Sequence, residues 1–109
     1  MGYKLIRYSV KDTELETNRA LVAKVFEALD ETAPQGVRYL VFELDDGEFI
    51  HIVGERHVVG EGNGASGLTG LAAFEAFTRN HAERRSTPVQ RSPARIIGNY
   101  HVLEAGKAG

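Results

Sequence analysis

Hydrophobic and polar residues alternate on either side of a turn between Val37 and Val53, and the rest of the sequence is organised around this stretch. Asp46-Gly47 at its centre is typical of a two-residue β-hairpin turn, because a type I′ turn needs positive φ at both central residues. The alternation places two sets of side chains on opposite faces of the hairpin. One set is Leu40, Phe42, Leu44, Ile50 and Ile52, and the other is Tyr39, Val41, Glu43, Phe49, His51 and Val53.

An amphipathic helix is predicted between residues 13 and 33. Thr13 and Glu16 have the spacing of a capping box, and Pro34 disfavours helical geometry in the residue before it, so we expect the helix to end near Ala33. Its apolar stripe contains one amide, Asn18. A buried amide needs hydrogen-bond partners, so Asn18 is expected either to bond a nearby backbone group or to point at a ligand between helix and sheet.

Residues 3–10 and 95–103 alternate as strands do, and a second amphipathic helix is predicted from Leu71 to about residues 84–86. The order of elements predicts an α+β, ferredoxin-like βαββαβ fold, with a four-stranded antiparallel sheet and both helices on one face. We expect one domain over residues 1–103 and a frayed tail at 104–109. The side chains expected under the helices are Ile6, Tyr8, Val10, Leu40, Phe42, Leu44, Ile50, Ile52, Ile96, Tyr100 and Val102.

The opposite face of this predicted sheet mixes apolar and polar side chains. It is too apolar to remain exposed, and its charged and amide groups would be costly in a sealed interior. We therefore expect two sheets to meet around a partly open cavity in a two-fold homodimer; the alternative is a monomer whose sheet is half covered by loops. The members of this face are Tyr3, Leu5, Arg7, Tyr39, Val41, Glu43, Phe49, His51, Val53, Ile97, Asn99 and His101.

Composition narrows the class of protein. The 109 residues include no cysteine and carry a net charge of −2, so we expect no disulfide and no general attraction to nucleic acid. No apolar run approaches the ~18 residues of a membrane span, and we expect a cytoplasmic protein without membrane contact. Residues 62–67 match G-x-G-x-x-G, but they follow an antiparallel hairpin, so we predict a surface lid or linker and no dinucleotide site.

Several polar residues of the mixed face are candidates for chemistry. Near neutral pH His51 could take a proton from a phenol or enol, Arg7 could hold an anionic oxygen, and Asn99 could orient a carbonyl. The structural alternatives are that His51 bonds Glu43 or Tyr39 across the hairpin and that Arg7 pairs with Glu43. The remaining candidate ligand-binding residues are Tyr39, Phe49, Glu43, His101 and Asn18.

Metal binding is not expected. The four histidines show no helical pairing with one another and have no cysteine to join them, so a zinc site is not predicted. His81 on the second predicted helix has the position of a possible haem axial ligand; the alternative is a histidine that interacts with the helix dipole at the helix end.

Three segments resemble a known family. They are the Val37-to-Gly47 hairpin, the helix Leu71-Ala-Ala-Phe-Glu-Ala-Phe77, and the segment Ile96-Ile-Gly-Asn-Tyr100. Together with the order of elements, they resemble the dimeric α+β barrel proteins, and within these the antibiotic biosynthesis monooxygenase-like group, many of which are uncharacterised. The resemblance covers about residues 3–103 and implies a homodimer.

The same resemblance implies two functions. One is a cofactor-independent monooxygenase acting on a small aromatic or enolisable substrate, with His51 as base and no cofactor. The other is a non-catalytic module that binds a small molecule or serves dimerisation. Many characterised members use a tryptophan, and this chain has none. The characterised members include haem-degrading oxygenases, and the missing tryptophan counts most against that activity.

Overall fold

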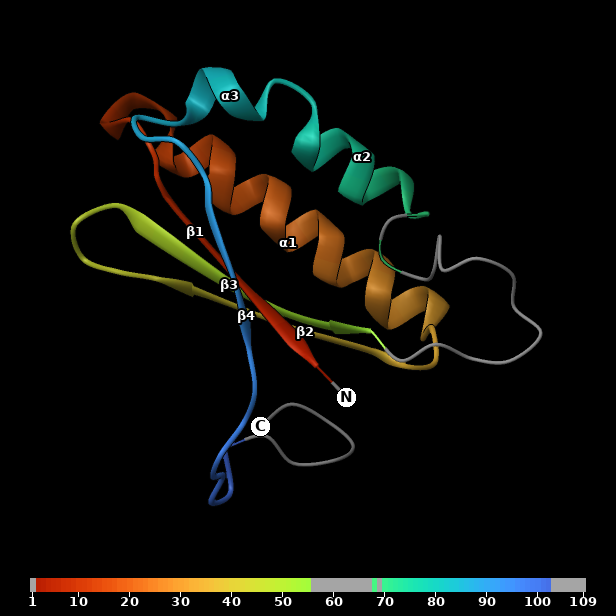
Figure 1. The fold of residues 1–109 in the computed structure, drawn as a ribbon. Helices are drawn as coiled ribbons and strands as arrows, with labels where there is room; N and C mark the ends of the chain where they lie inside the picture. Colours follow the sequence, from red (N-terminus) through yellow and green to blue (C-terminus); the bar gives the residue numbers. More distant parts are fainter. Residues whose placement is uncertain (1, 56–67, 69, 103–109) are drawn as a thin grey trace.

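The computed structural model of the chain describes residues 2–55, 68 and 70–102. Its strands pair antiparallel in the order β2-β3-β1-β4, and the helices lie on one face of the sheet (Figure 1). This is the predicted ferredoxin-like arrangement. The elements are β1 (Tyr3–Ser9), a 3-10 turn η1 (Asp12–Glu14), α1 (Leu15–Thr32), β2 (Val37–Glu43), β3 (Glu48–Glu55), α2 (Ala72–Thr78), α3 (His81–Arg84) and β4 (Gln90–Ala94). The glycine-rich segment 62–67 and the tail 104–109 lie outside the described residues.

Helix α1 ends as predicted but begins differently. Thr13 lies inside η1, and neither that turn nor α1 has a side-chain capping bond, so the predicted capping box is wrong. At the other end Ala33 adopts a left-handed conformation with φ 44°, and its N–H donates to the carbonyl of Leu29 at 2.8 Å. This bond satisfies one of the carbonyl groups that a helix end leaves free.

The second predicted helix is divided into α2 and α3. Asn80 adopts φ 60° between them, a left-handed conformation that asparagine tolerates better than most residues. The break turns α3 toward the end of β1, where the N–H of Lys11 donates to the carbonyl of Arg84 at 2.9 Å. A second bond, from Ser86 N–H to Ser9 carbonyl at 2.8 Å, joins the same two segments.

The last strand was predicted in the wrong place. Strand β4 pairs with β1 through Gln90–Ala94, whereas residues 95–102 continue beyond it and extend away from the sheet (Figure 1). The alternating apolar residues after Arg95 suggested a strand more strongly than the polar, proline-containing β4 did. Pro93 is tolerated because β4 is an edge strand, which needs ladder bonds on one side only.

The hairpin pairs as predicted, but its turn has a different form. Leu40 lies opposite Ile52 and Phe42 opposite Ile50. Leu44 N–H donates to the Glu48 carbonyl at 2.8 Å, which leaves a three-residue loop instead of the predicted two-residue turn. In this loop only Gly47 has positive φ, at 85°. A type I turn followed by a left-handed glycine gives this geometry.

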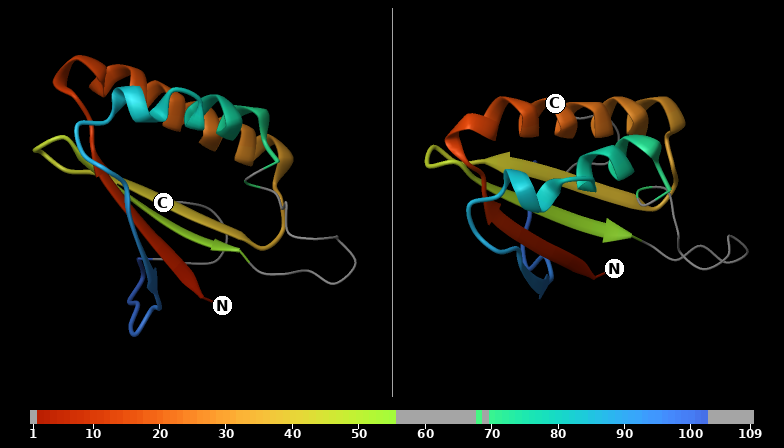
Figure 2. Two further views of the ribbon diagram at one scale, coloured as in Figure 1. Left: turned by 45° about the horizontal axis from the view of Figure 1, so that its top comes forward. Right: turned by 90° about the horizontal axis from the view of Figure 1, so that it is seen from above.

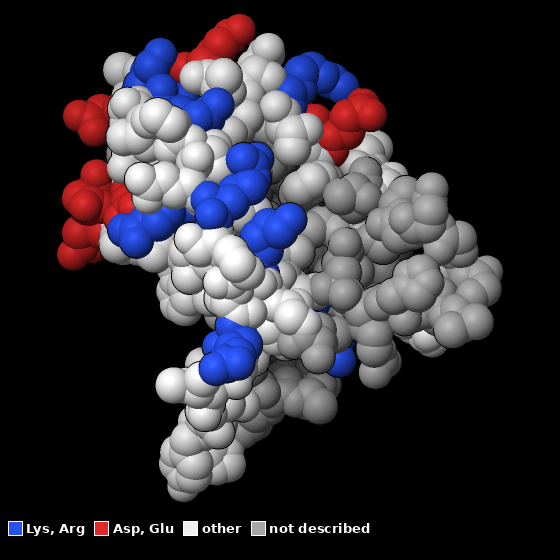
Figure 3. Space-filling view, viewed as in Figure 1, with Lys and Arg blue, Asp and Glu red and all other residues white. Residues whose placement is uncertain are grey.

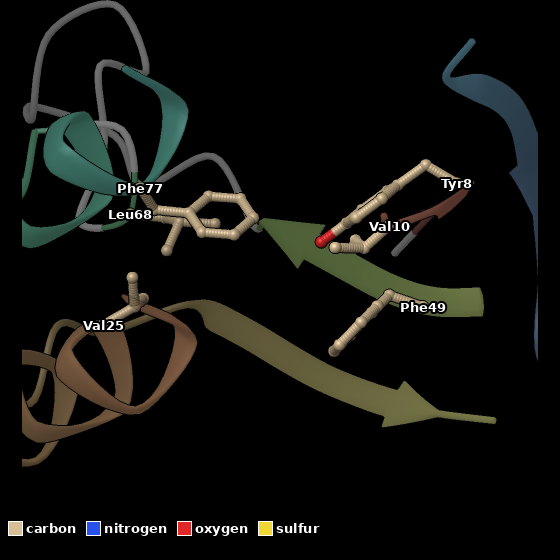
Figure 4. Close-up of a cluster of buried hydrophobic side chains, with 6 residues drawn as sticks. All are labelled: Tyr8, Val10, Val25, Phe49, Leu68 and Phe77. Carbon is tan, nitrogen blue, oxygen red and sulfur yellow. The ribbon is translucent and has the colours of Figure 1, made fainter. Parts of the chain in front are cut away.

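The faces of the hairpin are the reverse of the prediction. The side chains of β2 and β3 that contact the helices are Val37, Tyr39, Val41, Phe49, His51 and Val53, together with Tyr8 of β1 and Val10 just after it. In Figure 4, the side chains of Val25 (α1), Phe77 (α2) and Leu68, which precedes α2, lie across from those of Tyr8, Val10 and Phe49. Both faces of the hairpin are apolar, so alternation defined two sets of side chains but could not indicate which set the helices cover.

Both views in Figure 2 place the helices of residues 2–55 and 70–102 on one side of the sheet, so none of these helices covers the other face. Phe42 on this face remains 48% exposed. Arg7 forms an ion pair there with Glu48, with 2.8 Å between the Arg7 Nε and the Glu48 carboxylate. The apolar members of this uncovered face are Leu5, Leu40, Phe42, Ile50 and Ile52.

Candidate active site

A pocket of about 350 Å³ lies between the helix-covered side of the sheet and the α2–α3 segment. Its volume falls in the range of small-molecule sites, which span roughly 300–1,000 Å³. The sheet contributes Tyr8, Tyr39 and His51, and the helices contribute Phe74, Phe77 and His81. The pocket is therefore lined largely by aromatic and aliphatic side chains, with a few polar groups among them.

His51 is clamped between two tyrosine hydroxyl groups. Its Nε2 lies 2.8 Å from the hydroxyl of Tyr8, and its Nδ1 lies 2.7 Å from the hydroxyl of Tyr39. The imidazole is only 3% exposed. Neither ring nitrogen is left over to bond a bound molecule directly.

Arg84 and Asn18 extend this cluster. The Asn18 Nδ2 amide donates to the Tyr8 hydroxyl at 3.2 Å, and Nε of Arg84 donates to Oδ1 of Asn18 at 3.0 Å. Arg84 is 5% exposed, and it also donates to the carbonyl groups of Phe77 at 2.6 Å and Arg79 at 3.1 Å. We call Arg84, Asn18, Tyr8, His51 and Tyr39 the buried relay.

The direction of the hydrogen bonds follows from Arg84, because a guanidinium group can only donate. Asn18 must therefore turn its oxygen toward Arg84 and its NH₂ toward Tyr8. Among the described residues the Tyr8 hydroxyl bonds only Asn18, from which it accepts, and Nε2 of His51, so its own hydrogen finds an acceptor only at Nε2 of His51. A neutral His51 then carries its proton on Nδ1 and donates to Tyr39, which leaves the Tyr39 hydroxyl hydrogen for a molecule in the pocket.

Burial keeps His51, Tyr8 and Tyr39 of the relay neutral at physiological pH. Burial, and to a lesser degree the nearby His81, lowers the pKa of His51 to about 4. Burial raises the pKa of Tyr8 to about 12 despite the opposing effects of Asn18 and Arg84, and burial also raises the pKa of Tyr39. Placing a proton on His51 at pH 7 costs about 4 kcal/mol, at 1.36 kcal/mol per pKa unit. The cluster is thus better suited to donating a hydrogen bond than to storing a proton.

His81 begins α3 and faces into the same pocket. Its ring meets Tyr8 edge-on at a centroid distance of 4.5 Å and lies 5.1 Å from the ring of Phe77. Burial, followed by the positive charges of Arg84, Arg85 and Arg91, lowers the pKa of His81 to about 4. The structure places His81 at the start of the short helix α3 instead of near the end of one longer helix.

The structure brings some predicted site residues together. His51 and Tyr39 line the pocket, although on the opposite face of the sheet from the one expected. Asn18 is buried beside them and bonds two side chains, so its predicted backbone bond is wrong. Phe49 lies in the core, stacked on Tyr8 at 5.7 Å. The alternative that His51 bonds Tyr39 is confirmed.

Other predicted residues lie elsewhere. Arg7 is on the uncovered face of the sheet, and Glu43 pairs with Arg19 at 2.7 Å instead of with Arg7 or His51. Asn99 and His101 follow β4 and are not part of the sheet. There the N–H of Val102 donates to Oδ1 of Asn99 at 3.2 Å. The predicted trio of His51, Arg7 and Asn99 is therefore not assembled within one chain.

Sequence reasoning singled out His81 but missed the other helix-side residues of the pocket, such as Phe74 and Phe77, and its two arginines, Arg85 and Arg91. The alternation of side chains along β1 could have identified Tyr8, because it places Tyr8 on the same face as Ile6 and Val10. Combined with the hairpin in its observed orientation, this parity would have grouped Tyr8 with Tyr39 and His51. Arg85 could not be found in this way, because the break at Asn80 determines its position.

Metal and membrane sites receive no support from the described residues. Within residues 2–55, 68 and 70–102, no three His, Asp or Glu side chains are grouped closely enough to hold a metal ion. In the same part of the chain, no helix combines the length and apolar character needed to cross a bilayer.

Comparisons with known proteins find structural similarity only. No family model matches the chain, and no curated protein matches its sequence. Among solved structures, Rv0793 from Mycobacterium tuberculosis matches 90% of this chain and 96% of its own, with a TM-score of 0.64 and 17% identity. A protein named "putative antibiotic biosynthesis monooxygenase" from Nitrosomonas europaea matches 88% of this chain and 89% of its own, with a TM-score of 0.67 and 13% identity.

A similarly named protein from Deinococcus radiodurans matches 95% of this chain and 100% of its own, with a TM-score of 0.59 and 14% identity. At these identities the likeness concerns the fold and carries no residue roles. Because the matches extend over nearly the whole of each chain, this protein has the fold of the antibiotic biosynthesis monooxygenase-like proteins, as its sequence indicated.

Proposed function

We propose that this protein binds a small aromatic molecule in the pocket beside the buried relay and promotes its oxidation by O₂ without a cofactor. The observation that carries the proposal is the aromatic pocket with a directed hydroxyl donor, Tyr39, on its wall. Rings of this kind favour offset or edge-to-face contacts with a flat ligand. The monooxygenase names of the structural neighbours agree with the proposal.

Tyr39 is the residue proposed to contact the reacting oxygen. A substrate whose CH₂ group lies beside a carbonyl loses a proton to solvent, and the resulting enolate oxygen accepts the Tyr39 hydrogen bond. The enolate then gives its electrons to O₂: one oxygen atom converts the CH₂ group to a carbonyl, and the other leaves as water. His51 acts through Tyr39, as a positioning residue, and replaces the direct base suggested by the sequence.

Oxygen uptake with a panel of quinols and anthrones tests this function. We expect uptake with at least one compound, and Tyr39→Phe should lower its kcat about 100-fold, the usual cost of removing one oxyanion donor. Tyr3→Phe, on β1 but outside the pocket lining, is the matched control and should retain activity. Binding without uptake would instead identify the protein as a binding module, and equal kcat in both variants would exclude the role of Tyr39.

We further propose that the uncovered face of the sheet is the contact between two copies of this chain. Leu5, Leu40, Phe42, Ile50 and Ile52 are neighbours on this face, Phe42 is 48% exposed, and contiguous exposed apolar patches mark sites of protein–protein contact. Next to it, the segment 95–102 carries Ile97 at 94% and Tyr100 at 83% exposure. A second copy would cover both features, and the pocket would remain on the other side of the sheet.

A further inference from the structure

The charged side chains of the pocket all have one sign. Arg85 and Arg91 line it, whereas no Asp or Glu among the described residues does. Arg91 lies on β4 opposite Ile6, and Arg85 is held at the end of β1 by its backbone bridge to Val10. In Figure 3, Lys and Arg atoms gather on the face that carries α3 and β4, and the Asp and Glu atoms lie toward its edges.

Neither arginine is neutralised by the part of the chain that the structure describes. The ion pairs there are formed by Arg7, Arg19 and Arg79. Nη1 of Arg85 donates to the carbonyl of Thr87 at 3.1 Å, a neutral acceptor that leaves the positive charge in place.

Two buried nitrogen atoms beside these charges have no partner in the described residues. They are Nε of Arg85 and Nε2 of His81. The Nε–H of Arg85 is a donor, and the neutral imidazole of His81 donates when its proton is on Nε2. A buried donor without a partner costs about 1–3 kcal/mol, so such a group calls for an acceptor. Both residues line the pocket. The missing acceptor is therefore expected from a molecule bound in the pocket.

We propose that the ligand of this pocket is an aromatic acid, and that its carboxylate binds between Arg85 and Arg91 and accepts a hydrogen bond from His81. Its ring lies against the aromatic wall formed by Phe74, Phe77 and Tyr8, and an oxygen on the ring reaches Tyr39. This inference rests on the proposed function, because it assigns the ligand class of the same pocket. Arginine suits the role, since its planar group matches a carboxylate with two parallel bonds.

Calorimetric titration with 2-naphthoate and 2-naphthalenemethanol tests the inference. The two compounds share a ring system and differ in charge. We expect the acid to bind at least ~10-fold more tightly than the alcohol, because hydrogen bonds to a charged group outweigh those to a neutral one. The difference should shrink in 0.5 M salt, which screens charges beyond about 4 Å.

Arg91→Met should weaken binding of the acid ~10-fold and leave binding of the alcohol unchanged, and Arg85→Met is a second, independent variant. Arg38→Met is the matched control, since Arg38 bonds only the carbonyl of Val37 among the described residues and does not line the pocket. Equal affinity for acid and alcohol, or equal loss of both in Arg91→Met, would overturn the aromatic-acid assignment while leaving the aromatic pocket intact. Failure of both compounds to bind would overturn the pocket's proposed function as well.

Discussion

Replacing Arg84 with methionine is expected to lower the free energy of unfolding by about 4 kcal/mol, because each buried acceptor that loses its donor costs roughly 1–3 kcal/mol. Three acceptors are affected: the carbonyls of Phe77 and Arg79 and Oδ1 of Asn18. The guanidinium also lies 5.3 Å from the centre of the Phe77 ring, a contact that methionine cannot reproduce electrostatically. Urea unfolding followed by circular dichroism measures the change.

Arg79→Met is the matched control for this experiment. Arg79 pairs with Glu75 one helical turn away at 3.1 Å, and both side chains are largely exposed. An exposed pair of this kind contributes about 0.3–0.5 kcal/mol. If Arg84→Met lowered the free energy of unfolding no more than Arg79→Met, the guanidinium would not be holding α2, α3 and α1 together. The hydrogen-bond directions inferred from Arg84 would then lack support.

Phe42→Glu is expected to weaken association of two chains by ~100-fold or more, the effect of removing one strong interface residue. Phe42 lies on the uncovered face and is already 48% exposed, so the substitution should leave the fold of a single chain intact. It places a carboxylate at a surface that we propose to be apolar on both copies. Sedimentation at micromolar concentration should show twice the chain mass of 12.0 kDa for the natural protein and the single-chain mass for the variant.

Ala23→Glu controls for the added charge, since Ala23 is exposed on α1, away from the uncovered face. This variant should sediment like the natural protein. A natural protein that sediments at the single-chain mass would contradict the homodimer. It would not affect the pocket, because the residues that line the pocket all belong to one chain.

The order of elements and the pairing of the hairpin could be predicted because they follow from local patterns. Side-chain parity along a strand determines which residues share a face, so Leu40, Phe42, Ile50 and Ile52 were grouped correctly. Which face of the hairpin the helices cover depends on how the side chains of that face pack against the helices. The set under the helices contains His51 and Tyr39, which are acceptable there because each bonds the other.

The position of β4 shows a second limit of local patterns. Gln90 and Arg91 pair with β1 because the α3–β1 contacts at Lys11 and Arg84 fix where the returning chain begins to pair. The apolar residues after Arg95 suggested a strand, but this segment of the chain extends away from the sheet and its apolar side chains are exposed. The strongly alternating residues after Arg95 therefore belong to a surface that we propose contacts a second copy of the chain.

The candidate site was predictable in part. His51 and Asn18 stood out as polar residues in apolar patterns, and both lie in the buried relay. Their proposed partners, Arg7 and Asn99, were chosen by an assumed common face and lie elsewhere. In the sequence, Arg84 stood out only as a residue near the expected end of the second helix. Its role became visible only once the break at Asn80 had placed α3 across the end of β1.

The central claim is that the two faces of the sheet have separate roles, with the ligand on the helix-covered face and the second copy on the uncovered one. Methyl-resolved NMR of isoleucine-, leucine- and valine-labelled protein tests it directly, because Ile6 and Val53 line the pocket while Leu5, Ile50 and Ile52 lie on the uncovered face. We predict that adding 2-naphthoate changes the methyl chemical shifts of Ile6 and Val53 most. Diluting the protein should instead change those of Leu5, Ile50 and Ile52. Naphthoate shifts centred on Leu5, Ile50 and Ile52 would contradict the account.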